Sequence, residues 1–223
     1  MTERAADVPA ETRERILDAA EALFGERGFD SVSLRDITGQ AEANVAAVNY
    51  HFGSKEKLVD AVVERHAGPI NEERMRRLAD AEERFEEGPV PVSEILDAFL
   101  RPVVDEIMKD PVTERVFCKF MGRIMSEQGY QLPESVKPLF QQMAAAFAQA
   151  LRMARPDLSD QTVMWRMHYS FGVMSHTLMH SEKLEQISAG RSGNPGLEKL
   201  FDHIIEFCAA GFLAPEQGEE GQW

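Results

Sequence analysis

Apolar positions recur at helical spacing along most of the chain, whereas the alternation that marks a half-buried strand is absent. In the first such stretch Ile16, Ala20, Leu23 and Phe24 fall on one face, and Gly28 follows as a C-terminal cap. The sequence therefore predicts an all-α protein that begins with an amphipathic helix.

Two short helices are predicted next. Ser33-Leu-Arg-Asp36 has the spacing of a capping box, in which the serine bonds a backbone amide and the acid answers it. Leu34, Ile37 and Ala41 form the inner face of the helix that follows.

A third helix is predicted to turn Val45, Val48 and Phe52 inward. Gly53-Ser54 then ends this helix and caps a fourth, which runs to about residue 66. Three helices within about 45 residues, the last two short and joined by a tight turn, have the spacing of a helix-turn-helix.

Proline and glycine divide the remainder of the chain into further apolar-periodic stretches. Helices are predicted at roughly 70–86, 93–109, 112–128, 134–154, 159–184 and 196–213. Residues 214–223 are acidic and are expected to form a disordered tail.

The outward face of the third helix has side chains that suit the major groove of DNA. On a helical wheel the residues that point away from the apolar side are Asn44, Ala46, Ala47, Tyr50 and His51, with Asn49 at the edge. Asparagine can bond an adenine edge, alanine can meet a thymine methyl, and tyrosine or histidine can reach a phosphate or a base. Lys55 follows at the start of the next helix, where its ammonium and the free amides favour a phosphate. Taken singly, each side chain fits an ordinary solvent-facing helix equally well.

The stretch from Ala41 to Leu58, AEANVAAVNYHFGSKEKL, resembles the signature of the TetR family of bacterial regulators. In that family a Tyr-x-His-Phe-x-x-Lys-x-x-Leu segment ends the recognition helix and opens the next helix. The upstream segment RERILDAAEALFGERGFDSVSLRDITGQA also resembles the first two helices of the family. The resemblance covers roughly residues 11–66.

Two positions depart from the usual pattern of the family. Glu42 stands where the family usually has glycine, which leaves room for a differently shaped turn. Asn49 stands where the family usually has tyrosine, with Tyr50 next. A subset of the family carries Asn-x-Ala-Ala-x-Asn-Tyr-His-Phe, and this sequence matches that subset. Which of Asn49 and Tyr50 contacts a phosphate is left open.

The resemblance implies a domain organisation and a set of DNA contacts. It implies a DNA-binding helix-turn-helix domain over residues 1–55 and a helical effector-binding and dimerisation domain over 56–213, followed by the tail over 214–223. Carried over by position, the contacts are Ser33, Arg35, Asn44, Ala46, Ala47, Asn49, Tyr50, His51 and Lys55, while Phe52 belongs to the core.

By the same resemblance the protein is expected to be a one-component transcriptional regulator. It would be a repressor that binds a palindromic operator as a dimer and leaves it when a small lipophilic effector binds. Some regulators with this recognition helix respond to fatty acids or acyl thioesters, so an amphipathic anion is the first expectation. A cationic or neutral lipophile is the alternative.

The charge of the chain is unusual for a DNA-binding protein. The net charge is -14, and residues 1–60 hold seven Lys or Arg against twelve Asp or Glu. The acids lie mostly on the first helix, at Glu11, Glu14, Asp18, Glu21 and Glu26, which need not face the duplex. We therefore expect weak binding to random DNA and a reliance on base contacts and dimer avidity.

The C-terminal two-thirds is rich in phenylalanine and methionine at helical spacing, which suits a site for apolar ligands, although such stripes more often form plain core. The candidate effector-pocket residues are Phe99, Phe117, Phe120, Met121, Arg123, Phe147, Trp165 and Phe171. Arg123 and Arg152 lie in apolar segments and would bind an anion if buried, but such arginines more often reach the surface or pair with an acid.

Two further patterns concern a metal and a dimer. His176 and His180 have a spacing that can hold a metal, but no third ligand is evident, so neither a metal nor another cofactor is expected. The predicted helices at 159–184 and 196–213 correspond to the dimer-forming pair of the family. Their small residues, which would allow close packing, are Ser170, Gly172, Ser175, Ala209, Ala210 and Gly211.

Other classes of protein find little support in the sequence. No apolar run approaches the roughly 18 residues that cross a bilayer, and the charged first thirty residues differ from a signal peptide. Cys118 and Cys208 match no metal or redox spacing, so a cytoplasmic protein is expected. Because no phosphate-binding loop, nucleophile elbow or zinc-spaced set occurs, we do not expect an enzyme. The alternative is a helical protein-interaction module with a degenerate helix-turn-helix.

Overall fold

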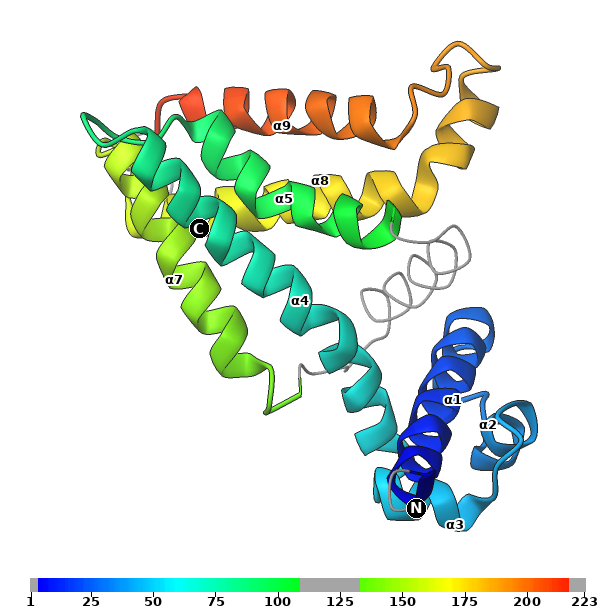
Figure 1. Cartoon of the computed structure of the whole chain (residues 1–223). Helices are drawn as coiled ribbons and strands as arrows, with labels where there is room; N and C mark the ends of the chain where they lie inside the picture. Colours follow the sequence, from blue (N-terminus) through cyan, green and yellow to red (C-terminus); the bar gives the residue numbers. More distant parts are fainter. Residues whose placement is uncertain (1–3, 109–132, 217–223) are drawn as a thin grey trace. The chain divides into compact units, whose positions relative to one another are not determined.

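The computed structural model describes residues 4–108 and 133–216, and every regular element in these ranges is an α-helix (Figure 1). The helices are α1 (Arg4–Arg27), α2 (Leu34–Gln40), α3 (Val45–His51), α4 (Lys55–Arg84), α5 (Val92–Met108), α7 (Lys137–Ala154), α8 (Asp160–Ile187) and α9 (Leu197–Leu213). The predicted all-α fold, with an N-terminal helix-turn-helix, is confirmed. The helix predicted at 112–128 lies outside the described residues.

The described residues divide into two compact units. The N-terminal unit contains 4–68, 107–108 and 133–137, and the C-terminal unit contains 69–106 and 138–216. Helix α4 begins in the first unit and continues into the second.

Helix α4 is continuous through Gly68-Pro69, where the sequence predicted a break between helices at 55–66 and 70–86. Proline lacks an amide hydrogen, so the carbonyl of Arg65 loses its usual helical partner. The glycine before the proline has no Cβ and relieves the crowding that normally turns this position away from the helical region. The prediction of two helices was therefore wrong, although the boundary between the two units does fall between Gly68 and Pro69.

The core of the N-terminal unit is built by helices α1, α2 and α3, which pack against one another, and by the first turns of α4. Its apolar side chains are at most 9% exposed. They include Ile16, Leu17, Ala20, Leu23 and Phe24 of α1, Ile37 of α2, Val48 and Phe52 at α3, and Leu58 and Val62 of α4. This core holds the two short helices at a fixed place on α1.

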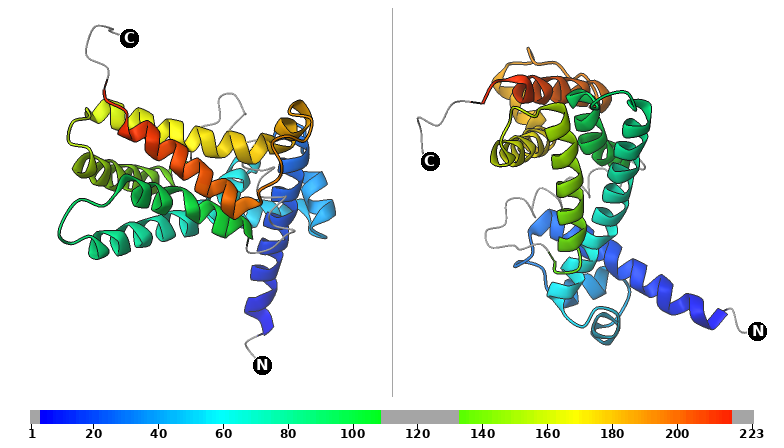
Figure 2. Two further views of the ribbon diagram at one scale, coloured as in Figure 1. Left: turned by 90° about the horizontal axis from the view of Figure 1, so that it is seen from above. Right: turned by 90° about the vertical axis from the view of Figure 1, so that its left-hand side faces the viewer.

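The core of the C-terminal unit lies among α4, α5, α7, α8 and α9, and α8 runs beside α9 (Figure 2). Its largest buried side chains are Ile95, Leu96, Phe99 and Leu100 of α5, Phe147 and Leu151 of α7, Met167 and Met174 of α8, and Phe201 and Phe212 of α9. Ion pairs join the helices at their edges, including Arg101 of α5 with Asp202 of α9 at 2.7 Å.

The segment after α9 is held against the start of α8. Ser159 caps α8, and its amide and hydroxyl donate to the carboxylate of Glu216 at 2.9 and 2.5 Å. Arg166 donates to the carbonyl oxygen of Ala214 at 2.8 Å. The first residues of the segment 214–223 therefore contact the C-terminal unit.

Candidate nucleic-acid interface and ligand-binding residues

The N-terminal end of α2 has the predicted capping box. The Ser33 hydroxyl accepts the amide of Asp36 at 3.2 Å, and the Asp36 carboxylate accepts the amide of Ser33 at 2.8 Å. The Ser33 hydroxyl also donates to the Asp36 carboxylate at 2.5 Å, and this bond, followed by the one from the Ser33 amide, lowers the pKa of Asp36. Ser33 and Arg35 are both exposed, so their side chains are accessible where phosphate contacts are predicted.

The turn between α2 and α3 has a left-handed residue at Glu42, with φ of 50°. The amide of Ala43 donates to the carbonyl of Thr38 at 2.9 Å, as in the Schellman motif that ends many helices. Left-handed backbone at a residue with a Cβ costs about 1 kcal/mol, which is why glycine is common at such positions. The replacement of glycine by Glu42 therefore changes the side chain at this turn while a glycine-type conformation is kept.

Asn44 begins α3 as its N-cap. Its side-chain oxygen accepts the amide of Ala47 at 2.8 Å, and the side chain of Ala47 is itself half-buried. An asparagine oxygen in this role satisfies one of the free amides of the first turn. The structure thus gives Asn44 a capping bond at a position where the sequence suggested a contact with a base.

The exposed face of α3 consists of Val45, Ala46, Asn49 and Tyr50, and Tyr50 is 81% exposed. Val45 was predicted to point inward but is 37% exposed, because it is the first residue of the helix and only Val48, a turn later, reaches the core. The side chains of this face are therefore small and apolar at the start of the helix, and polar and aromatic at its end.

The end of α3 carries a short series of rings. The His51 ring is half-buried and lies 5.0 Å from the Tyr50 ring and 6.1 Å from the Phe52 ring. Lys55 is half-buried at the first position of α4, where the Ser54 hydroxyl accepts the amide of Lys57 at 3.2 Å. The predicted start of a helix at Gly53-Ser54 is thus confirmed. Lys55 is the first residue of this helix and follows the end of α3 by four residues.

Arg13 of α1 is a cation near α3 that the sequence did not single out. Its guanidinium carbon lies 5.4 Å from the centroid of the Phe52 ring, at the C-terminal end of α3. Because α1 is acidic overall, its pattern gave no reason to expect a cation beside the recognition helix. Arg13 thus places a guanidinium, which also pairs with Glu14 at 2.9 Å, against the residue that ends α3.

Three acids of α1 form ion pairs with α4. Arg65 forms ion pairs with Glu14 at 3.2 Å, Asp18 at 2.7 Å and Glu21 at 3.4 Å. Glu21 is 4% exposed and also lies 2.9 Å from Nε2 of the buried His66. Burial lowers the pKa of Arg65, but the bond to Asp18 and the three negative charges outweigh it and raise the pKa overall. Three of the acids of α1 therefore face α4, where they share the single positive charge of Arg65.

The predicted effector-pocket residues have different places in the C-terminal unit. Phe99 and Phe147 are buried, and their ring centroids are 5.3 Å apart. Phe171 is half-buried, whereas Trp165 is 51% exposed and stacks on Tyr169 with centroids 5.9 Å apart. Phe117, Phe120, Met121 and Arg123 lie outside the described residues. Of the described candidates, only Phe99 and Phe147 contact each other in the interior.

The remaining polar candidates lie at the surface. Arg152 pairs with Asp160 at 2.6 Å and its side chain is 54% exposed, which confirms the alternative of a surface ion pair. The rings of His176 and His180 stack 4.5 Å apart. No group of three metal-ligating side chains occurs in residues 4–108 and 133–216.

Sequence reasoning did not predict two buried polar residues of α4. A polar residue within an apolar stripe interrupts the pattern and gives no sign that its side chain is buried. Asn71 is 0% exposed and Arg74 is 3% exposed. Arg74 donates from Nε to the carbonyl of Phe99 at 2.7 Å and from Nη1 to Oδ1 of Asn71 at 2.9 Å. Its guanidinium carbon lies 4.9 Å from the centroid of the Phe99 ring. Burial lowers the pKa of Arg74 to about 10, which leaves the side chain positively charged near neutral pH.

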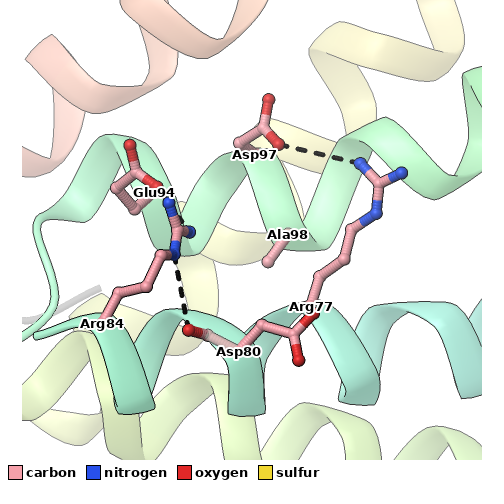
Figure 3. A pocket seen from close by; sticks show the side chains of 6 residues that line it. All are labelled: Arg77, Asp80, Arg84, Glu94, Asp97 and Ala98. Atoms are coloured by element: carbon pink, nitrogen blue, oxygen red, sulfur yellow. Dashed lines mark hydrogen bonds and ion pairs between the residues drawn. The ribbon is translucent and has the colours of Figure 1, made fainter.

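A pocket of about 320 Å³ lies between α4 and α5 (Figure 3). Arg84 pairs with Glu94 at 2.9 Å, and Arg77 lies 3.8 Å from Asp97. Asp80 and Ala98 complete the lining. The lining holds two arginines and three carboxylates, and charges of both signs already pair across the pocket.

Together these features define a helix-turn-helix unit with a capped, exposed third helix, joined through α4 to a helical unit with an apolar interior. The family model described as "Bacterial regulatory proteins, tetR family" matches residues 16–62, and "Tetracyclin repressor-like, C-terminal domain" matches residues 97–211. The second match alone covers half of the chain. The chain therefore belongs to the TetR family.

Individual relatives are similar over parts of the chain. The HTH-type transcriptional regulator AcrR of Shigella flexneri is 32% identical over 124 residues, which is 54% of this chain and 56% of that protein. The HTH-type transcriptional repressor Rv3405c of Mycobacterium tuberculosis is 47% identical over 53 residues, 24% of this chain and 28% of that protein. The chain thus matches about half of the first relative's length and less of the second's.

Solved structures agree over nearly the whole chain. SmeT, the repressor of the Stenotrophomonas maltophilia multidrug efflux pump SmeDEF, matches with a TM-score of 0.59 at 23% identity, covering 95% of this chain and 99% of SmeT. At this identity the match supports the fold. None of the helices in the described ranges is long and apolar enough to span a membrane.

Proposed function

We propose that this protein is a TetR-type transcriptional repressor that binds a palindromic operator as a dimer and is released by a small lipophilic effector. The observation that carries the proposal is the exposed end of α3, where Asn49 and the 81% exposed Tyr50 follow a helix start fixed by Asn44. A short rigid helix with an exposed polar and aromatic face fits the major groove, where base edges are read.

The negative charge of the chain is compatible with this role. Arg13, Arg35, Lys55 and Lys57 supply cations on or next to α2 and α3, while Arg65 engages three of the acids of α1. Phosphate contacts contribute most of the binding to random DNA. We therefore infer that the protein binds random DNA weakly. Its specific affinity would come from base contacts and from the two helix-turn-helix units of the dimer. We also infer that it acts in the cytoplasm.

The dimer is proposed to form through exposed faces of α8 and α9. Along α8 the exposed Trp165 and Tyr169 and the partly exposed Gly172 lie on one side of the helix. Along α9 the 68% exposed Phe207 is followed on the same side by Ala210 and Gly211. Large rings beside small residues suit close packing with a second copy, and a two-fold pair fits a palindromic operator.

The effector is proposed to bind in the C-terminal unit beside the Phe99 and Phe147 rings. A solved relative, SmeT, is described in complex with triclosan, which makes an apolar small molecule a reasonable class of ligand for this fold. Release of DNA requires that the effector binds the DNA-incompetent state more tightly than the DNA-bound state.

The test begins with selection of a binding site from a pool of random DNA, followed by titration of the full chain onto that site and onto a scrambled site at two salt concentrations. We expect saturable binding to the selected site alone. Tyr50→Ala should weaken it by about tenfold or more. Lys55→Ala should lower the slope of log affinity against log salt by about 1.

Lys199→Ala is the matched control, because it removes the same charge from an exposed position of α9. If no site is selected, or if Tyr50→Ala and Lys199→Ala behave alike, the repressor proposal is wrong. The protein-interaction module with a degenerate helix-turn-helix would then take its place.

A further inference from the structure

The α4 side chains Asn71 and Arg74 form a buried cluster of hydrogen-bond donors. A guanidinium has five N–H groups, of which Arg74 uses one on the Phe99 carbonyl and one on Asn71, which leaves three. No carboxylate of the described residues pairs with Arg74, although it is only 3% exposed. Among the described residues, the site therefore holds a positive charge without a carboxylate partner.

Asn71 adds a donor at the same place. Its Oδ1 accepts from Nη1 of Arg74, which fixes the orientation of the amide because an arginine can only donate. The other end of the amide is Nδ2, which is buried and has no hydrogen-bond partner in the described structure. A buried donor without an acceptor is unfavourable, and an anion is the acceptor that would also balance the charge of Arg74.

The apolar side of the cluster is formed by two aromatic rings. The guanidinium carbon of Arg74 lies 4.9 Å from the Phe99 ring centroid, and the Phe99 ring lies 5.3 Å from the Phe147 ring. Phe99 is 5% exposed and Phe147 is 1% exposed. A molecule that satisfied the donors would have the rest of its surface close to these rings.

We propose that Arg74 and Asn71 bind the carboxylate of an amphipathic effector whose apolar part packs near Phe99 and Phe147. A planar carboxylate matches the planar guanidinium and can also accept from the Asn71 amide, so one group satisfies both. This inference deepens the proposed function and rests on it, since it names the chemical class of the effector.

The chemistry of the cluster separates a carboxylate from the other candidate ligands. A cation would be repelled by Arg74, and a neutral lipophile would leave its charge and the Asn71 donor as they are. Nearby cations of α4, such as Arg77 and Arg84, already pair with carboxylates and so do not share this property.

The experiment measures ligand binding to the full chain by calorimetry, with three probe acids, benzoate, hexanoate and decanoate. Each acid is compared with the alcohol that has the same carbon skeleton. We expect at least one of these acids to bind more tightly than its alcohol. Arg74→Met should weaken the binding of that acid by about tenfold to a hundredfold and leave the alcohol unchanged.

Two variants keep the interpretation sharp. Asn71→Asp places a carboxylate 2.9 Å from Arg74, at the position of the present Oδ1. It should weaken the binding of the acid, as Arg74→Met does. Arg77→Met removes the same charge one turn further along α4, where Glu73 already pairs with the arginine at 2.7 Å, and should have no effect on the acid. The melting temperature of each variant without ligand shows that it is folded.

The proposal is overturned if no acid binds, if acids and alcohols bind equally, or if Arg74→Met binds the acid as tightly as the unmodified protein. Binding to the selected operator, measured on the same samples without ligand, reports on the proposed function separately. A protein that binds the acid through Arg74 but never binds DNA would contradict the repressor and leave the carboxylate site standing. A protein that binds DNA but no acid would contradict the carboxylate site and leave the repressor proposal standing.

Discussion

Helix α4 carries a half-buried arginine, Arg65, in the N-terminal unit and a buried one, Arg74, in the C-terminal unit, and the two have different partners. In the N-terminal unit Arg65 pairs with Glu14, Asp18 and Glu21, and its neighbour His66 bonds Glu21 as well. In the C-terminal unit Arg74 has a carbonyl and an amide oxygen as acceptors and no carboxylate among the described residues. Within the described residues, the same residue type on one helix thus has carboxylate partners in one unit and none in the other.

The difference separates a structural role from a binding role. Three carboxylates around Arg65 tie α1 to α4 and hold the helix-turn-helix unit together, so no acceptor is missing there. Arg74 contributes little to the fold through charge, because an unpaired buried cation is unfavourable. An arginine in this state gains most when a ligand supplies the anion.

Removal of Glu21 breaks the compensated site and should have the largest effect. Glu21→Ala takes the buried carboxylate from His66 and from Arg65 together. Because both partners remain in place without this acceptor, the free energy of unfolding should fall by about 3 kcal/mol. Chemical denaturation of the full chain measures the change.

Glu14→Ala is the control for this prediction. Glu14 contacts the same arginine at 3.2 Å, but its side chain is 52% exposed, so the loss should stay below about 1 kcal/mol. Equal losses for Glu14→Ala and Glu21→Ala would mean that burial of the Glu21 pair adds nothing to the stability of the unit.

The two arginines should respond differently to the same substitution. Arg65→Met removes the cation that Glu14, Asp18 and Glu21 share and should lower the free energy of unfolding by about 1–2 kcal/mol. Arg74→Met removes an uncompensated charge and should leave stability within about 1 kcal/mol of the unmodified protein, or raise it. A larger loss for Arg74→Met than for Arg65→Met would reverse the comparison.

Much of the fold follows from local signals in the sequence. The capping box at Ser33 and Asp36 and the start of α4 after Gly53-Ser54 are confirmed, because caps depend on residues within one turn of each other. Val45 was misplaced since a helical wheel has no ends, whereas a first-turn side chain can miss the core. The break expected at Gly68-Pro69 does not occur, because glycine before the proline relieves the crowding and the helix loses only one hydrogen bond.

The candidate sites were less accessible to sequence reasoning. Periodicity identifies a buried stripe but not the partners of a polar residue within it. Asn71 and Arg74 were therefore not predicted as buried polar residues. Arg152 was considered as an anion-binding residue, but it forms an ion pair at the surface. Trp165 has an apolar side chain at helical spacing, yet it is 51% exposed. Sequence spacing alone does not distinguish the interior of one chain from a surface that a second copy would cover.

Asn71→Asp should give Arg74 a carboxylate partner, as Arg65 already has. The new carboxylate would stand where Oδ1 accepts from Arg74 at 2.9 Å and would supply the missing counter-ion. A charge-assisted hydrogen bond is stronger than a neutral one, so the free energy of unfolding at neutral pH should rise by about 1 kcal/mol. The gain should disappear as the pH falls below about 4, where aspartate in the unfolded chain takes up a proton. A loss of stability at neutral pH would indicate that Arg74 is already compensated.

The smallest effect is expected at the surface of α4, where Glu73 accepts hydrogen bonds from Arg76 and Arg77 at 2.7 Å. The bond from Arg76 comes first among the causes that lower the pKa of Glu73 from 4.5 to about 2, against the opposing effect of burial, and Arg77 adds to it. Since the folded pKa is depressed, this stabilisation is present above about pH 4.5 and is lost as the pH falls toward 2. Glu73→Gln should therefore cost less than about 1 kcal/mol at neutral pH and flatten the acid limb of the stability curve. Denaturant titrations at neutral pH and in acid compare the two proteins, and an unchanged difference between them at both pH values would show that the Glu73 carboxylate is not the group that titrates.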